Sequence, residues 1–443
     1  ENGLIQGLPA ADPRITAFKG IPFAAPPVGE NRWRAPQPAA DWEGTLKAFE
    51  FAPISMQATP GVNPDDFYSR EWHVDPNVPM DEDNLYLNVW TPAKSTDEKL
   101  PVYVWIFGGG FQYGYTSEME FDGERLARRG AIVVTVNYRL NVFGFLGHPE
   151  ITKEAPDAPT NFGLLDQQAG IEWVKRNIAA FGGDPDNITV GGQSAGGASV
   201  MHQLTAPQNK GLFQNAVVLS GVFENVYKNG GIPGSGRTLA EVEEAGVKFF
   251  DFMGVSTLEE ARALDGEFVR EKLLEYKAFW GPVIDNKFVM GNVFELFMAN
   301  KRLMVPVMLG QTSTEFFGVP EVSSLDAFKE MADKLFGADA DEFLKLCDFE
   351  SGNLDAIKQK ASIPTIEYAI RVLGKANTDT GADMPLYFYN FDPEIPGWDN
   401  PGTFHSADLW FFFETLAKCW RPFVGKHYDL AREMSNYLAN FIG

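Results

Sequence analysis

Residues 192–196, with the sequence Gly-Gln-Ser-Ala-Gly, constrain the fold of this chain more than any other segment. They follow the apolar residues 188–190 and open a run of small residues that predicts a helix start, which gives the pattern G-x-S-x-G between a strand and a helix. The flanking glycines permit a turn so sharp that the hydroxyl of Ser194 stands exposed at the end of the strand. The segment therefore predicts a nucleophile elbow, in which a serine is held ready to attack.

Strands and helices are predicted to alternate around this turn. Apolar runs of strand length occupy residues 102–107, 131–137, 187–190 and 216–219, and helical patterns occupy residues 166–180 and 195–204. Residues 305–310 and 385–390 predict two further strands. This alternation is typical of βαβ crossovers and of a large, mostly parallel sheet.

The rest of the chain predicts one domain, residues 1–443, with helical insertions. Residues of about 221–300 and 320–380 have helical patterns with acidic polar faces, and we expect them to form a helical subregion over one sheet edge and over the active site. No repeat, low-complexity tract or linker separates two halves. The amphipathic residues 428–441 predict a last helix that packs on the outside.

Composition excludes several classes of partner. The formal net charge is −23 and the longest apolar runs are only strand-sized, so we expect neither a nucleic-acid nor a membrane partner. The two cysteines, Cys347 and Cys419, lie in no metal-binding pattern, so no metal site is predicted. Such sparse cysteine favours a reducing, cytoplasmic environment. A cleaved signal peptide stays open as an alternative, because the chain does not begin with methionine.

A serine nucleophile needs a base, and the chain has five histidines. The best candidate is His405, in a loop that leads into the aromatic residues 409–413, a sequence that suits the floor of a cleft. The other four are less suitable: His202 lies about two turns along the helix that Ser194 opens, His148 precedes a proline in a turn, His73 lies in a polar loop, and His427 borders the last helix, where we expect a surface role.

The base needs an acid, and the oxyanion needs hydrogen-bond donors. Glu315 follows the apolar residues 305–309 and should lie at a strand's C-terminal end, whereas Asp285, in a turn, and Asp408, close to His405 in sequence, are alternatives that better suit structural roles. The donors expected for the oxyanion are the backbone N–H groups of Gly109, Gly110 and Ala195. The glycine run fits neither G-x-G-x-x-G nor G-K-[ST], so we expect no nucleotide and no other cofactor.

Further segments resemble the type-B carboxylesterase family, the cholinesterase-like branch of the α/β-hydrolases, over nearly the whole chain. They are Phe-Lys-Gly-Ile-Pro-Phe-Ala at 18–24, Glu-Asp-Asn-Leu-Tyr-Leu-Asn-Val at 82–89, Val-Asn-Tyr-Arg at 136–139, and residues 161–185, which end in Phe-Gly-Gly-Asp-Pro. The resemblance implies an α/β-hydrolase fold, with a large central sheet flanked by helices. It also implies a Ser-Glu-His triad at Ser194, Glu315 and His405, with Gly109, Gly110 and Ala195 as the oxyanion hole.

The expected activity is hydrolysis of a small-molecule ester through an acyl-enzyme. Aromatic residues expected near the site predict an apolar cleft for aryl or short-to-medium acyl esters; they are Phe111, Phe316, Phe317 and Trp410, which have core packing as their alternative role. Trp72 falls in the loop where cholinesterases hold a cation-binding tryptophan, which implies contact with the alcohol part of the ester. Packing within the loop is the equal alternative for Trp72.

Departures from the family pattern narrow these expectations. Many members have a cysteine pair where this chain has Ser55 and Asn84, and its absence resembles the family's bacterial cytoplasmic esterases. Many also have glutamate where Gln193 stands, which disfavours choline esters. A hydroxycinnamoyl, carbamate or lactone hydrolase, a lidded lipid hydrolase and a non-catalytic binding protein remain as alternatives, and the oligomeric state is open.

Overall fold

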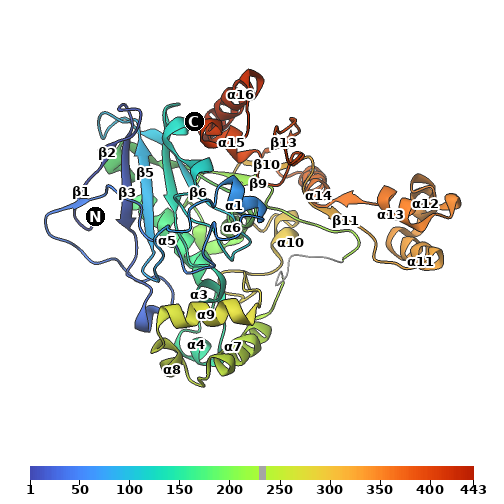
Figure 1. Cartoon of the computed structure of the whole chain (residues 1–443), viewed down its shortest axis with the longest axis horizontal. Coiled ribbons are helices and arrows are strands. Elements are labelled where there is room, and N and C mark those ends of the chain that lie inside the picture. The colour runs from blue at the N-terminus through green and yellow to red at the C-terminus, as the bar shows by residue number, and fades with distance from the viewer. Residues whose placement is uncertain (229–235) are drawn as a thin grey trace.

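The computed structural model describes residues 1–228 and 236–443, and a large mixed sheet runs through its centre (Figure 1). Within these residues the sheet has nine strands, in the order β13-β10-β9-β8-β6-β7-β5-β3-β2. Their bounds are β2 (Leu8–Pro9), β3 (Thr16–Pro22), β5 (Tyr86–Thr91), β6 (Leu100–Ile106), β7 (Ile132–Val136), β8 (Gly183–Gln193), β9 (Asn215–Leu219), β10 (Val307–Thr312) and β13 (Leu386–Phe391). The strands from β13 to β7 are parallel, and β5, β3 and β2 continue the sheet in antiparallel pairs.

The parallel strands form because their residues are apolar on both faces. Every residue of β7 is buried, and Val104 of β6 pairs with Val134 on one side and Val190 on the other. Such continuous apolar runs are typical of parallel strands that helices cover on both faces. The mostly parallel sheet predicted from the sequence is therefore confirmed, although β8 begins at residue 183, four residues before the predicted strand.

Helices pack against this sheet. The main ones are α5 (Phe162–Asn177) and α6 (Ala195–Thr205), which contact β8, and α16 (Gly425–Ile442), which contacts β6 and β8. Four short helices are α1 (Phe67–Glu71), α2 (Glu124–Ala127), α3 (Asn141–Phe145) and α15 (Leu409–Phe412). Two small sheets pair β1 (Leu4–Gln6) with β4 (Thr45–Lys47), and β11 (Phe317–Gly318) with β12 (Ile363–Pro364).

The predicted helical insertions are present, but they form two groups rather than one subregion (Figure 1). The first joins α4 (Pro149–Glu154) to α7 (Leu239–Met253), α8 (Leu258–Arg262) and α9 (Gly266–Tyr276), with residues 229–235 outside the described part of the chain. The second is α11 (Leu325–Phe336), α12 (Ala340–Leu346) and α13 (Leu354–Lys360), while α10 (Val293–Met298) and α14 (Thr365–Asp379) lie nearer the sheet. The groups separate because they bury different apolar surfaces. The first packs on the main core, with Phe250 against Trp33 and His148, whereas the second forms a cluster of its own, with Phe328 against Phe343.

The C-terminal ends of four neighbouring parallel strands lie at one edge of the sheet. These strands are β8, β9, β10 and β13, and the chain leaves them at Gln193, Leu219, Thr312 and Phe391. In open α/β sheets ligands bind at this edge. We therefore expect the residues that follow these four strands to form a site.

Candidate active site

The turn between β8 and α6 has the sharp geometry that the sequence predicts. Ser194 has φ 57° and ψ −124°, a strained conformation for a residue with a side chain. A Cβ atom at Gly196 would lie 2.0 Å from the carbonyl oxygen of Ile106, and one at Gly192 would lie 2.3 Å from the carbonyl oxygen of Gly196. Both glycines are therefore required by close backbone approaches. The N–H of Ser194 donates to the carbonyl of Leu219 at 2.9 Å, which ties the turn to β9.

The structure brings Ser194, His405 and Glu315 together as a hydrogen-bonded chain. Nε2 of His405 lies 2.7 Å from Oγ of Ser194, and Nδ1 of the same ring lies 2.5 Å from Oε2 of Glu315. The side chains of His405 and Glu315 are only 12% and 3% exposed. Because the contact is shielded from water, Glu315 holds the imidazole in one orientation. The three residues come from loops far apart in the sequence, as predicted.

The carboxylate of Glu315 is held by two donors besides the histidine. Its Oε1 accepts from the hydroxyl of Ser220 at 2.9 Å and from the N–H of Thr312 at 2.9 Å. Ser220 directly follows β9 and is buried. Sequence reasoning missed Ser220, because its only signal was a position at the end of a predicted strand.

The histidine loop is also held from outside the triad. The hydroxyl of Tyr68, on α1, donates to the carbonyl of His405 at 2.8 Å. Nε2 of Gln193 donates to the hydroxyl of Ser406 at 2.8 Å and lies 3.4 Å from Nε2 of His405. The ring of Phe316 lies 4.7 Å from the imidazole, centroid to centroid. Nothing in the local sequence around Tyr68 indicated this contact, which joins segments 337 residues apart.

The glycine loop after β6 fits the predicted oxyanion hole. Gly109 and Gly110 have φ values of 127° and 62°, and a Cβ atom at Gly109 would lie 1.9 Å from the carbonyl oxygen of Tyr113. Within the described residues, the backbone N–H groups of Gly109, Gly110 and Ala195 donate to no protein acceptor. These three donors are therefore free to bind an oxygen that develops negative charge.

The phenylalanines predicted to line the pocket differ in their exposure to solvent. Phe316 and Phe317 are 46% and 49% exposed, and Phe316 presents apolar surface beside the histidine, whereas Phe317 pairs with Pro364 in the small sheet of β11 and β12. Phe111 is buried, with its ring 5.4 Å from that of Phe145. The prediction that Phe111 faces the substrate is therefore not supported by its packing.

Two tryptophans predicted at the pocket lie in the core instead. Trp72 is buried under Tyr68, whose ring stacks on it at 5.3 Å, and beside Trp410 at 5.8 Å. Trp410 is 1% exposed, and its indole N–H donates to Glu71. The prediction that these two side chains line the pocket is wrong, because both rings are used in a second hydrophobic cluster.

The other histidines lie outside the triad. His202 is fully buried, which lowers its pKa to about 4, His148 caps α4 by accepting from the N–H of Glu150, and His73 pairs with Glu118. The surface role predicted for His427 is wrong. It is buried at the start of α16, where its Nδ1 accepts from the N–H of Val424.

The two rejected aspartates have structural roles, as predicted. Oδ1 of Asp285 accepts three backbone N–H groups, from Lys287, Phe288 and Val289. Asp408 is fully buried and accepts from the hydroxyl of Tyr389 at 2.7 Å. Burial, chiefly, and the nearby charge of Glu315 raise the pKa of Asp408 to about 7.

The cysteines, the acidic and histidine side chains and the long helices give no sign of a second kind of site in the described residues. Cys347 and Cys419 are both free thiols. No group of three or more His, Cys, Asp or Glu side chains in the described ranges is arranged to hold a metal ion. In that same part of the chain, no helix combines the length and the apolar character needed to span a bilayer.

The chain is similar in sequence to a known family and to known esterases. A model of the family described as "Carboxylesterase family" matches residues 1–350. Para-nitrobenzyl esterase of Bacillus subtilis is 33% identical over 95% of this chain and 84% of its own, and fumonisin B1 esterase of Sphingopyxis macrogoltabida is 30% identical over 94% and 74%.

Solved structures give the same result. The carboxylesterase EST55 of Geobacillus stearothermophilus, at pH 6.2, matches with a TM-score of 0.74 and 28% identity, over 99% of this chain and 88% of its own. A structure titled PNB esterase matches with a TM-score of 0.76 and 29% identity, over the same shares. The likeness therefore extends over the whole sheet and the loops that carry the site.

Proposed function

The chain belongs to the carboxylesterase family and hydrolyses carboxylic esters, and we propose that Ser194, Glu315 and His405 are its catalytic triad. The observation that carries this assignment is the chain of contacts from Oγ of Ser194 through both nitrogens of His405 to Oε2 of Glu315, at 2.7 and 2.5 Å. A serine, a base and an orienting acid in this sequence of contacts is the arrangement that activates a hydroxyl.

In the acylation step, Nε2 of His405 takes the proton of Ser194 as Oγ attacks the ester carbonyl. The carbonyl oxygen becomes an oxyanion, which the N–H groups of Gly109, Gly110 and Ala195 stabilise. Because these donors are already fixed in the backbone, no reorganisation is needed as the charge develops. The histidine then gives its proton to the leaving alcohol, and the acyl group stays on Oγ.

Deacylation repeats these steps with water. His405 takes a proton from the water, which attacks the acyl carbonyl, and returns it to Oγ as the acid leaves. Glu315 keeps the proton of the imidazole on Nδ1 and stabilises the imidazolium that forms in both steps. Its own position is fixed by Ser220 and Thr312.

We further propose aryl or short-to-medium acyl esters as substrates. Support comes from the exposed ring of Phe316 beside the histidine, which offers flat apolar contact area. The relative named para-nitrobenzyl esterase supports an ester with an aromatic part. Gln193, an uncharged side chain beside the nucleophile, provides no carboxylate to attract a cationic alcohol.

Hydrolysis of p-nitrophenyl esters, from acetate to dodecanoate, tests both proposals. The wild type should turn over short chains fastest, and Ser194→Ala should abolish turnover while keeping the melting temperature of a folded protein. Residual activity of Ser194→Ala above about a thousandth of the wild type would contradict the triad. A maximum at dodecanoate would contradict the proposed acyl range.

A further inference from the structure

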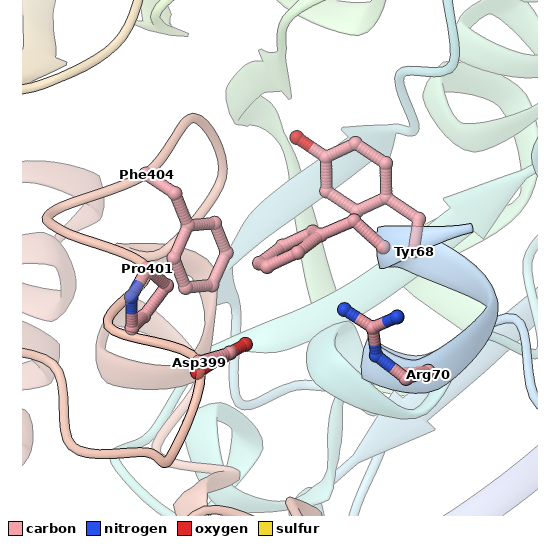
Figure 2. Close-up of a pocket in the computed structure, with 6 residues that line it drawn as sticks. Tyr68, Arg70, Asp399, Pro401 and Phe404 are labelled. Atoms are coloured by element: carbon pink, nitrogen blue, oxygen red, sulfur yellow. The ribbon is translucent and has the colours of Figure 1, made fainter. Parts of the chain in front are cut away.

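A cavity of about 450 Å³ lies beside the catalytic histidine, between α1 and the loop that leads to His405 (Figure 2). It is lined by Phe67, Tyr68, Arg70, Asp399, Pro401 and Phe404. Two of these residues are joined to His405. Phe404 precedes His405 in the chain, and the hydroxyl of Tyr68 donates to the carbonyl of His405. The triad itself does not line this cavity.

The cavity offers one charged donor and one charged acceptor. No carboxylate in the described residues forms an ion pair with Arg70, whose Nη1 donates only to the carbonyls of Pro64 and Asp65, at 3.3 Å each, and whose buried Nε has no partner. Each oxygen of Asp399 accepts one hydrogen bond from Arg421, at 2.9 and 3.0 Å, and retains further acceptor capacity.

This pair of charges selects against a charged ligand. In Figure 2 Arg70, from α1, and Asp399, from the loop that leads to His405, lie below the rings of Tyr68 and Phe404, and the charge of Arg70 acts on Asp399. A carboxylate bound at Arg70 would approach Asp399, and an ammonium group bound at Asp399 would approach Arg70, so both would meet a like charge. A neutral ligand that accepts from the guanidinium and donates to the carboxylate meets neither. Neighbouring hydroxyl groups provide both functions.

The walls favour a ring as the body of that ligand. Phe67 and Phe404 pack edge to face at 4.8 Å, and together with Tyr68 they give the cavity aromatic surfaces. Trp398 does not itself line the cavity, but it is 75% exposed, and the guanidinium of the lining residue Arg70 lies 5.5 Å from the centre of its ring. An exposed aromatic ring next to polar groups is typical of a ligand site. The ring stacks on a flat apolar face of the ligand, and the polar groups fix the ligand's orientation.

We infer that this cavity is a second binding site, which takes a neutral ring with an apolar face and neighbouring hydroxyl groups, supplied either by a sugar or by a hydroxylated aryl group. The ring lies against the aromatic walls. One hydroxyl accepts from Arg70 and its neighbour donates to Asp399. The site needs no turnover of the ligand, so it does not depend on the proposed triad.

Calorimetric titration of the Ser194→Ala protein tests this inference with two neutral probes that contain no carboxylic ester. They are methyl β-D-glucopyranoside and 3,4-dihydroxybenzamide, and benzamide is the control without hydroxyl groups. We expect one of the hydroxylated probes to bind and benzamide to bind at least about tenfold more weakly, because hydrogen bonds to charged groups are lost. The probe that binds shows whether the ligand is a sugar or an aryl group.

Variants in the same background locate the site. Arg70→Met keeps the stem of the side chain but removes its donors, and should weaken binding by about tenfold or more. Trp398→Ala should weaken it too, and this exposed position gives a second test if Arg70→Met does not fold. Arg125→Met, at an exposed arginine on α2, is the matched control and should bind as before.

Three results would overturn the inference: no binding of either hydroxylated probe, equal binding of benzamide, or unchanged binding in folded Arg70→Met and Trp398→Ala proteins. Hydrolysis of p-nitrophenyl acetate by the wild type is measured separately. Active wild type without probe binding would reject the second site alone. Probe binding with a wild type that is inert toward p-nitrophenyl acetate would reject the proposed short-acyl substrates and leave the second site standing.

Discussion

The substitution Glu315→Gln should inactivate the enzyme through the tautomer of its histidine. Oε1 of Glu315 faces the N–H of Thr312 at 2.9 Å, a backbone donor that cannot be reversed. The amide oxygen of a glutamine must therefore occupy the Oε1 position, which places its NH₂ group against Nδ1 of His405. Because NH₂ only donates, Nδ1 must accept, and the ring proton moves to Nε2, where it faces Ser194.

The expected loss of kcat depends on how strongly the flipped orientation of the glutamine amide is disfavoured. With the amide flipped, the buried N–H of Thr312 would face an NH₂ group, which costs about 1–3 kcal/mol for an unsatisfied donor. The flipped form is therefore disfavoured by roughly tenfold to a hundredfold. In the favoured form Nε2 of His405 carries a proton and cannot take another from Ser194. The flipped form restores the correct tautomer, so the tautomer alone lowers kcat by about tenfold to a hundredfold. The neutral amide also no longer stabilises the imidazolium, and an asparagine in place of a triad aspartate lowers kcat on the order of 10⁴-fold, so we expect a total loss between about 10²-fold and 10⁴-fold.

The assay is kcat for p-nitrophenyl acetate, with the melting temperature as a check on folding. Ser220→Ala is the matched control, since it removes the other donor to Oε1 but leaves Thr312 and the tautomer unchanged. It should lower kcat by only about tenfold, the effect of one hydrogen bond to a charged group. If Glu315→Gln keeps a tenth of the wild-type kcat, or if Ser220→Ala is equally damaging, the reasoning from the tautomer is wrong.

Three further predictions concern stability. The free energy of unfolding, measured by chemical denaturation, should be about 1 kcal/mol higher for Ser194→Gly than for Ser194→Ala. Glycine relieves the strain at φ 57° and ψ −124°, although it adds entropy to the unfolded chain. Equal free energies for the two variants would show that the turn is not strained. Burial raises the pKa of Asp408 to about 7, so between about pH 4 and pH 7 the folded protein keeps a proton that the unfolded chain releases, and its stability falls as pH rises. The melting temperature of Asp408→Asn relative to wild type should therefore increase from about pH 5 to pH 8, and a constant difference would contradict the shift. Arg421→Met leaves the buried carboxylate of Glu71 and the half-buried carboxylate of Asp399 without their shared partner, and chemical denaturation should show a loss of about 3–5 kcal/mol, whereas a loss below about 1 kcal/mol would mean that water replaces the arginine.

Sequence reasoning succeeded where local physics decides the structure. The runs that form β7 and β9 are almost entirely apolar, apart from Thr135 and the first residue Asn215, so they had to be buried strands. The glycines around Ser194 are required by backbone approaches within a few residues of the turn and to the adjacent β6, so the turn was readable from its own sequence. Glu315 was predicted from its place after a predicted strand, and His405 was chosen among the five histidines because its loop leads into the aromatic residues 409–413.

It failed where long-range packing decides the structure. Trp72 and Trp410 have sequences around them that fit a cleft as well as a core, and only their contact with each other and with Tyr68 places them inside. His427 was predicted at the surface because its helix is amphipathic, yet a capping bond to Val424 buries it. The two helical groups show the same limit, since an acidic amphipathic helix has no signal for which apolar surface it covers.

The hydrogen bonds that position the three triad residues differ in how far they reach along the sequence. Ser194 is placed by a bond from its N–H to Leu219, and Glu315 by a bond from the N–H of Thr312, so two of the three reacting groups are positioned through the backbone of the sheet. The histidine instead lies on a loop, and its carbonyl is held by the side chain of Tyr68. Because α1 is joined to the C-terminal part of the chain by the buried pair of Glu71 and Arg421, the position of the base depends on an ion pair between residues 350 apart. The geometry of the base is thus the part of the site that is most sensitive to global packing.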